Sequence, residues 1–155
     1  MFHEFILNLI IIIPVVGKLY KKWFVKRLTI SVRPGLCPNT IKELISELKK
    51  DYKNKYSILI APGPKEVEEA NKLNGKVVLY NNKPVNIKIL VSLINKAKFV
   101  IANDTGPAHI ASHLDKKGLV LFGSHTTAKK VSIENFNFKS LSVKYLKDLN
   151  VVTVL

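Results

Sequence analysis

From residue 27 onward, apolar runs of strand length alternate with segments whose apolar residues recur at the spacing of an α-helix. The pattern predicts strands at 27–33, 56–61, 76–80, 98–102 and 118–123. It predicts helices at 40–50, 65–73, 86–95 and 107–114, and a last helix at 142–149 in a less regular tail. Because apolar strands alternate with helices, the chain is expected to form an α/β fold, with a parallel sheet covered by helices on both faces.

An earlier apolar run, residues 5–16, precedes this alternation and is interrupted by Asn8 and Pro14. It is shorter than the roughly 20 apolar residues that a membrane-spanning helix needs. Two interpretations stay open: a buried helix or interface segment, or a segment that associates with a membrane with help from the basic residues after it. The sequence therefore divides into a hydrophobic and basic N-terminal segment, 1–26, and a domain, 27–155.

The charged residues of the sequence indicate the character of its surface and of its partners. The 155 residues suit one domain with a sizeable core, and the formal net charge is +14. Only Arg27 and Arg33 of the 25 basic residues are arginines, and the lysines are scattered through every segment. Scattered lysine favours a solvated surface, and it ranks a negatively charged membrane leaflet ahead of nucleic acid as an anionic partner. Cys37 is the only cysteine, so an intrachain disulfide is excluded and a reducing compartment fits.

The stretch NDTGPAHIA, residues 103–111, is the main candidate for chemistry. It predicts a strand end, a sharp turn and a helix that begins near Pro107, whose unpaired N–H groups can hold an anion such as a phosphate. Capping of that helix by Asp104 or Thr105 is an alternative that is compatible with anion binding. Gly63 and the pair at 123–124 also follow predicted strands, where ligands bind in parallel sheets.

Other motifs limit the kinds of binding site that the sequence can be expected to form. The phosphate-binding fingerprints GxGxxG and GxxxxGK[ST] are absent from the sequence. His109 and His113 lie four residues apart, but the zinc pattern HExxH needs a glutamate where this chain has Ile110, so no metal site is expected. His109 lies one turn into the predicted helix, close enough to the turn to reach the same ligand. Glu66 and Glu68 are expected by default to be solvated charges at a helix start.

The segment KAKFVIANDTGPAHIASHLDKKGLVLFG, residues 96–123, resembles the signature of glycosyltransferase family 9, the lipopolysaccharide heptosyltransferases. The resemblance extends in order over roughly 27–150. It implies a Rossmann-like domain that is the C-terminal half of the two-domain GT-B architecture, and a site for a nucleotide-diphosphate sugar, typically ADP-heptose. It also implies roles for residues: Asp104, Thr105 and Gly106 would meet the diphosphate and sugar with His109 beside them, Glu66 would bind the ribose, and the backbone near Val85 would meet the adenine.

Two departures from the family limit what the resemblance implies. The family's lysine after a Pro-Gly turn is missing here, since the turn at 34–35 is followed by no lysine before Lys42, and Arg33 is an untested substitute. The 26 residues before the first predicted strand are too few for the N-terminal domain, which supplies the acceptor surface and the acidic general base. Whether the chain alone is an enzyme is therefore left open.

The expected function is that of a glycosyltransferase donor domain that binds an ADP-heptose-like sugar nucleotide for synthesis of the lipopolysaccharide core. The alternative is a non-catalytic sugar-nucleotide or membrane-surface binding module left by truncation or gene splitting. Expected partners are the donor, the core acceptor and a separate N-terminal half, with no cofactor, metal or nucleic acid. The expected location is the cytoplasm, with association with the inner-membrane surface as an open alternative.

Overall fold

The computed structural model describes residues 7–13, 27–32, 38–51, 57–148 and 150–154. Nine strands are described: β1 Leu7–Ile13, β2 Arg27–Val32, β3 Ser57–Ile60, β4 Lys76–Val77, β5 Leu79–Tyr80, β6 Lys83–Pro84, β7 Ala97–Asn103, β8 Gly118–Phe122 and β9 Phe138–Ser142. The helices of the same residues are α1 Pro38–Asp51, α2 Val67–Asn71, α3 Ile87–Asn95, α4 Gly106–His113, α5 Ala128–Val131 and α6 Val151–Val154, with a 3₁₀ turn, η1, at Leu146–Asp148.

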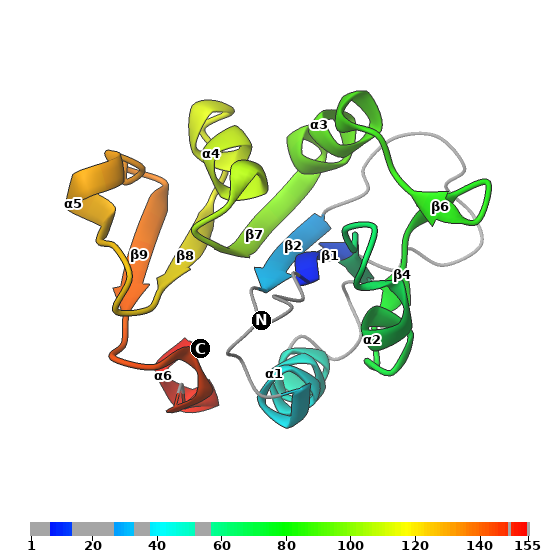
Figure 1. Cartoon of the computed structure of the whole chain (residues 1–155), viewed down its shortest axis with the longest axis horizontal. Coiled ribbons are helices and arrows are strands. Elements are labelled where there is room, and N and C mark those ends of the chain that lie inside the picture. The colour runs from blue at the N-terminus through cyan, green and yellow to red at the C-terminus, as the bar shows by residue number, and fades with distance from the viewer. Residues whose placement is uncertain (1–6, 14–26, 33–37, 52–56, 149, 155) are drawn as a thin grey trace, which may run out of the picture.

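Seven strands form one sheet in the order β4-β3-β1-β2-β7-β8-β9, and β2 also pairs with β3 and β1 with β7. Every pairing in this sheet is parallel except those of β1, which is antiparallel to β2, β3 and β7. Helices α3 and α4 cover one face, and α1 and α6 lie against the other (Figure 1). The expected α/β sandwich with helices on both faces is therefore confirmed, and the expectation of a purely parallel sheet is corrected at β1.

Alternation along the central strands divides the core into two layers. In β7, the side chain of Ile101 belongs to the layer beneath α1, whereas Val100 and Ala102 belong to the layer beneath α3 and α4. The predicted apolar face of the first helix is buried in the α1 layer, where Ile41, Leu44, Ile45 and Leu48 are each at most 6% exposed. Because both faces of the strands are buried, their continuous apolar sequence is explained.

The N-terminal apolar run was expected to be a helix if buried, and this is wrong for residues 7–13, which form β1. The run holds four consecutive isoleucines at 10–13, and β-branched side chains restrict χ1 and fit a pleated strand better than a helix. The remainder of residues 1–26 lies outside the described residues. No helix in the described ranges is long and apolar enough to span a membrane.

The tail also differs from the predicted helix at 142–149. Residues 138–142 form the edge strand β9, and within the predicted range only 146–148 make a helical turn. The spacing of Val143 and Leu146 suits a helix, whereas Leu141 and Val143 have the spacing of a strand. The strand forms because this segment pairs with β8 at the edge of the sheet. Pairing of β9 with β8 is extended by a hydrogen bond from the Val143 N–H to the Phe122 carbonyl (2.9 Å). Five consecutive parallel pairs hold β9 in this register.

The predicted strand at 76–80 is divided. Its first part, β4, pairs with β3, while β5 turns away and pairs with β6 in a hairpin. The two residues between β5 and β6, Asn81 and Asn82, both have positive φ (49° and 59°). A two-residue loop of this kind matches the twist of a hairpin, and asparagine tolerates the left-handed region better than most residues. The predicted turn at 81–84 is thus a tight hairpin turn.

Candidate functional site

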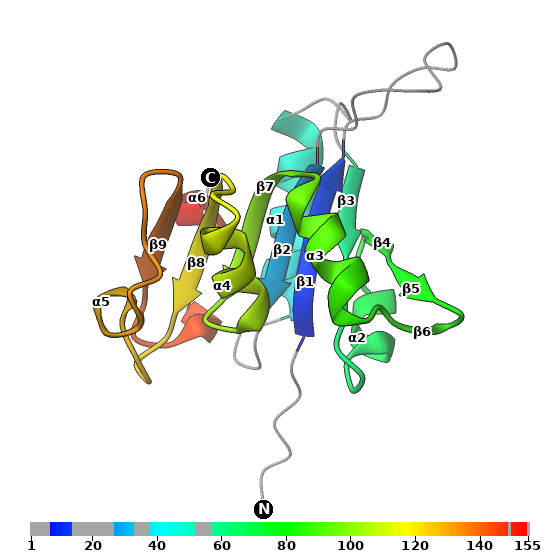
Figure 2. The same ribbon diagram turned by 90° about the horizontal axis from the view of Figure 1, so that it is seen from above.

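Three loops meet at the rim formed by the carboxyl ends of the parallel strands. They follow β3, β7 and β8, and this rim faces the viewer in Figure 1 and lies at the lower edge of Figure 2. Residues 63, 104–105 and 123–124, which the sequence placed after strands, lie in these loops, and residue 106 begins α4. The predicted gathering of special residues at one edge of the sheet is therefore what the fold produces.

The loop after β7 leads directly into α4. Thr105 is the N-cap residue in an extended conformation (φ −146°, ψ 169°), and its side chain makes no capping hydrogen bond to the helix. Its hydroxyl instead donates to the Asn103 carbonyl (3.2 Å). The Ala108 N–H donates to the Thr105 carbonyl (2.9 Å), and Pro107 has no N–H to offer.

Gly106 is the first residue of α4, and nothing lies within 4 Å of the position that a Cβ would occupy there. Among the residues that the structure describes, no acceptor contacts the Gly106 N–H. A helix start carries partial positive charge because its first N–H groups lack intrahelical partners. The start of α4 therefore carries an amide donor with no acceptor among the described residues, and side-chain capping by Thr105, one of the alternatives from sequence, is not seen.

The Asp104 carboxylate lies between two imidazoles. Its Oδ1 is 3.6 Å from Nε2 of His109, and its Oδ2 is 3.6 Å from Nε2 of His125. The Asp104 side chain is 12% exposed, whereas the two histidines are 40% and 42% exposed and reach the surface. Sequence reasoning placed His109 beside this turn and missed His125. The signal for His125 was its position two residues after Gly123, in the loop after the neighbouring strand β8.

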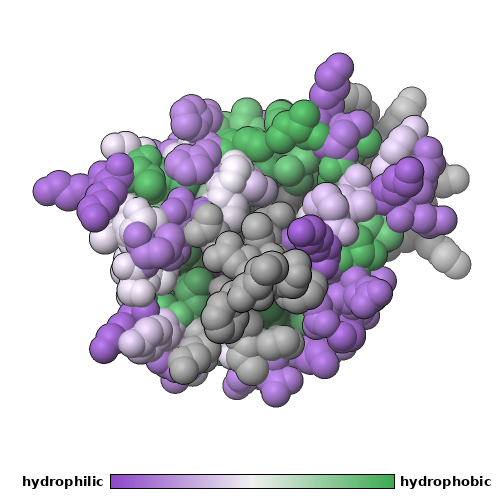
Figure 3. Space-filling view, viewed as in Figure 1, coloured by the Kyte–Doolittle hydropathy of each residue, from purple (hydrophilic) through white to green (hydrophobic). Residues whose placement is uncertain are grey.

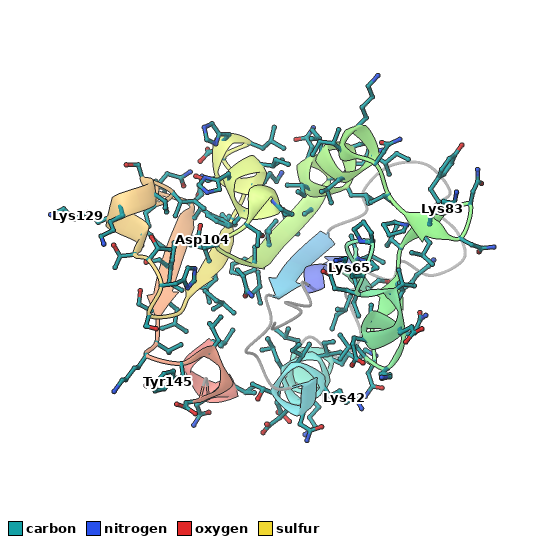
Figure 4. The ribbon with its side chains drawn as sticks, viewed as in Figure 1. Lys42, Lys65, Lys83, Asp104, Lys129 and Tyr145 are labelled. Carbon is teal, nitrogen blue, oxygen red and sulfur yellow. The ribbon has the colours of Figure 1, made fainter. Side chains whose placement is uncertain are left out.

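Glu66 is buried, with 3% exposure, and it is not the solvated helix-start charge expected by default. Its carboxylate Oε2 accepts a hydrogen bond from the Gly63 N–H, and its own N–H donates to the Gly63 carbonyl (3.2 Å). This double link folds the loop after β3 into a fixed turn. Lys65, on the same loop, is exposed and lies on the face of the molecule that also bears Asp104 (Figure 4).

Val85 lies between β6 and α3 and packs against the core layer beneath α3 and α4. The nucleoside-binding roles of Glu66 and Val85 stay predictions. Arg33 and the turn at 34–35 lie outside the described residues. In Figure 3 the described residues that border the middle of this face are a mixture of hydrophilic and hydrophobic groups.

Metal binding finds no support in the arrangement of the histidines. In the part of the chain that the structure describes, no group of three or more histidine, cysteine, aspartate or glutamate side chains is placed to hold a metal ion. His113 is exposed, and its Nδ1 lies 2.8 Å from the His109 carbonyl oxygen, within its own helix. Asp104 and the two imidazoles form a polar cluster at this rim.

Comparison with known proteins identifies the family and the fold of the chain. The sequence model of glycosyltransferase family 9 (heptosyltransferase) matches residues 42–143. The fold is similar to that of the E. coli heptosyltransferase WaaC with ADP, with a TM-score of 0.64 and 22% sequence identity. The match covers 76% of this chain and 37% of WaaC. No curated protein sequence matches the chain. The expected fold class, the Rossmann-like part of a GT-B glycosyltransferase, is thereby confirmed.

Proposed function

Because the chain belongs to glycosyltransferase family 9, we propose that it forms the C-terminal half of such an enzyme and binds the nucleotide-diphosphate sugar donor, ADP-heptose or a relative. The sugar would be passed to the growing lipopolysaccharide core on the cytoplasmic side of the inner membrane. The observation that carries the proposal is the start of α4 at the carboxyl-end rim of the sheet, where the Gly106 N–H has no acceptor among the described residues and the position of a Gly106 Cβ is open.

The charges around α4 support a diphosphate ligand. A phosphate oxygen accepts hydrogen bonds from the Gly106 N–H and from the N–H groups of His109 and His125. Asp104 is itself an anion and would repel a phosphate, so we assign it the role of holding the two imidazoles toward the ligand. The exposed ammonium group of Lys65 supplies a cation on the same face (Figure 4).

The reaction of such an enzyme transfers charge to the site just described. The acceptor hydroxyl attacks the anomeric carbon, the bond between that carbon and the diphosphate oxygen breaks, and the nucleoside diphosphate leaves with additional negative charge. The start of α4 and the imidazoles stabilise that charge because they are fixed before the reaction begins. The general base for the acceptor hydroxyl belongs, in this proposal, to a separate N-terminal half. The matched region spans 37% of WaaC, which leaves room for such a half.

Titration calorimetry of the full chain with ADP and with ADP-heptose tests the proposal. Gly106→Val places a branched side chain in the open space beside the helix start and should weaken ADP binding about tenfold or more, because that side chain blocks the approach of the anion to the backbone N–H of residue 106. Ser92→Val adds the same side chain at an exposed position of α3 and should bind as the parent does. Circular dichroism establishes that both variants fold.

Two results would count against the proposal: no binding of either nucleotide by the folded parent chain, or unchanged binding by Gly106→Val. Binding without turnover, when the N-terminal half and a lipopolysaccharide acceptor are both supplied, would favour the non-catalytic binding module instead. A duplex DNA of random sequence serves as the control for unspecific attraction by the positive charge, since such binding falls steeply with salt.

A further inference from the structure

The opposite rim of the sheet, formed by the amino ends of β7, β8 and β9, carries a second surface. Its members are one phenylalanine and the lysines around it, and we call this surface the lysine rim: Lys96, Lys98, Lys116, Lys117, Phe136 and Lys139. The segments that enter β7, β8 and β9 lie side by side along the upper edge of Figure 2. Hydrogen bonds from Val100 N–H to the Lys117 carbonyl and from Gly118 N–H to the Asn137 carbonyl join these segments.

Phe136 is 89% exposed, more than the other large hydrophobic residues whose exposure the structure describes. The loop that carries it is fixed by Asn135, whose side chain donates to Ser112 and accepts from the N–H groups of Asn137 and Phe138. The Ser112 hydroxyl also donates to the Ile133 carbonyl (2.6 Å). These bonds hold the loop against the end of α4, so the ring of Phe136 is kept in water by a rigid support.

The lysines of this rim are held close to one another. The Lys116 ammonium donates to the Asn95 carbonyl (2.8 Å) at the end of α3. Burial, and then the positive charge of Lys98, lower the pKa of Lys116, while Asp115 opposes them. The Lys139 ammonium lies 5.9 Å from the centre of the Phe136 ring.

Carboxylates compensate this charge only in part. Beside the five lysines the described rim carries Asp115 and Glu134, and the Glu134 carboxylate accepts from the Ser140 N–H (2.8 Å). The positive charges of this rim repel one another, and the exposed ring of Phe136 is unfavourable in water, so an anionic surface with an apolar interior would stabilise both.

We propose that the lysine rim docks onto a membrane surface that contains anionic lipids, with Phe136 entering the boundary between headgroups and acyl chains. A large apolar side chain beside several lysines is the combination that peripheral membrane contacts use. Nucleic acid is less favoured because the basic residues that make up the lysine rim are lysines, which lack the planar fork that pairs with phosphate and guanine. A single phenylalanine also offers no run of stacking platforms for bases.

This docking orients the chain. We call the rim at the carboxyl ends of the parallel strands, with the start of α4, the donor rim. Strand β7 connects the lysine rim to the donor rim over seven residues, a separation of about 20 Å at the rise of a strand. The start of α4 would then face the cytoplasm, where a soluble sugar nucleotide arrives. The lysine rim needs no nucleotide to bind, so its contact with lipid is independent of the proposed donor site.

Sedimentation of the full chain with vesicles tests the docking. Vesicles of phosphatidylglycerol and phosphatidylcholine should bind the chain, and vesicles of phosphatidylcholine alone should bind it far less. Phe136→Ser should lower the partition coefficient about tenfold, and Lys117→Glu by about fivefold or more, since each basic residue near an anionic surface contributes about that factor. Tyr80→Ser and Lys83→Glu make the corresponding changes on the exposed β5–β6 hairpin and should bind as the parent does.

Three results would overturn the proposal: equal losses in the hairpin variants and the rim variants, unchanged binding by Phe136→Ser, or equal binding to neutral and anionic vesicles. A rim that prefers duplex DNA over vesicles, with DNA affinity lost in the same rim variants, would also overturn it. Circular dichroism of each variant establishes that a loss of binding reflects the surface, because Phe136 and Lys117 are exposed and make little contact with the core.

Discussion

At the scale of single residues, the site depends on groups that lie far apart in sequence. Asp104 and His125 are 21 residues apart, and they meet because β7 and β8 pair in parallel, with Asn103 opposite Leu121. A motif centred on residues 103–111 contains Asp104 and His109 but cannot contain His125. For Glu66, the local sequence predicted the wrong environment. Its sequence suggested a solvated charge, yet α2 begins at Val67, and the side chain turns back to the Gly63 N–H in a buried loop.

Substitution of the histidines one at a time distinguishes those that would contact the ligand from one that lies on the surface away from it. We expect His109→Gln and His125→Gln each to weaken ADP binding by about five- to tenfold, because each removes an imidazole held by Asp104 at the donor rim. His113→Gln is the matched control, since His113 is exposed farther along the same helix and contacts the His109 carbonyl. Calorimetric titration measures all three. Equal losses in the three variants, or none in His125→Gln, would remove His125 from the site.

At the scale of elements, the sequence predicted the helices and strands whose apolar residues follow a regular pattern, because these elements are buried on both sides or on one clear face. The helix at α1 and the strands β3, β7 and β8 were foreseen because apolar spacing and burial agree. Strand β9 was not foreseen, because it is an edge strand whose first residue alone is fully buried and whose alternation is weak. Strand β1 was mistaken for a helix because a continuous apolar run has no period that distinguishes the two.

Close packing of three neighbouring strands requires a glycine at the start of β8. A Cβ at Gly118 would overlap the Val100 carbonyl oxygen in β7 and the ring of Phe138 in β9. We expect Gly118→Ala to lower the free energy of unfolding by about 1–3 kcal/mol, because overpacking forces the strands apart. Gly106→Ala is the control: its new methyl group meets open space, so stability should stay equal or rise by up to about 1 kcal/mol. Urea denaturation measures both, and equal midpoints would contradict the packing argument.

At the scale of the whole molecule, the sheet separates two surfaces for which we propose different ligands. The amino ends of its strands carry the lysine rim, and the carboxyl ends carry the start of α4 with its imidazoles. The family assignment bears on the donor rim, since the matched residues 42–143 include the turn at 104–106 and both histidines. The same range also includes the lysine rim, but a family match assigns it no role. The charge of +14 is thus distributed over surfaces that serve separate purposes in the two proposals.

The two rims should act independently. Their separation of about 20 Å exceeds the screening length of about 8 Å at physiological salt, so a charge bound at one rim has little effect at the other. We therefore expect saturating anionic vesicles to leave the dissociation constant for ADP unchanged within about twofold. In turn, Gly106→Val should leave the vesicle partition coefficient unchanged, and Phe136→Ser should leave ADP binding unchanged. Fluorescence titration with a labelled ADP, with and without vesicles, measures this. Displacement of ADP by vesicles would show that lipid approaches the carboxyl ends of the strands, and the docking orientation would then be wrong even if the donor site were right.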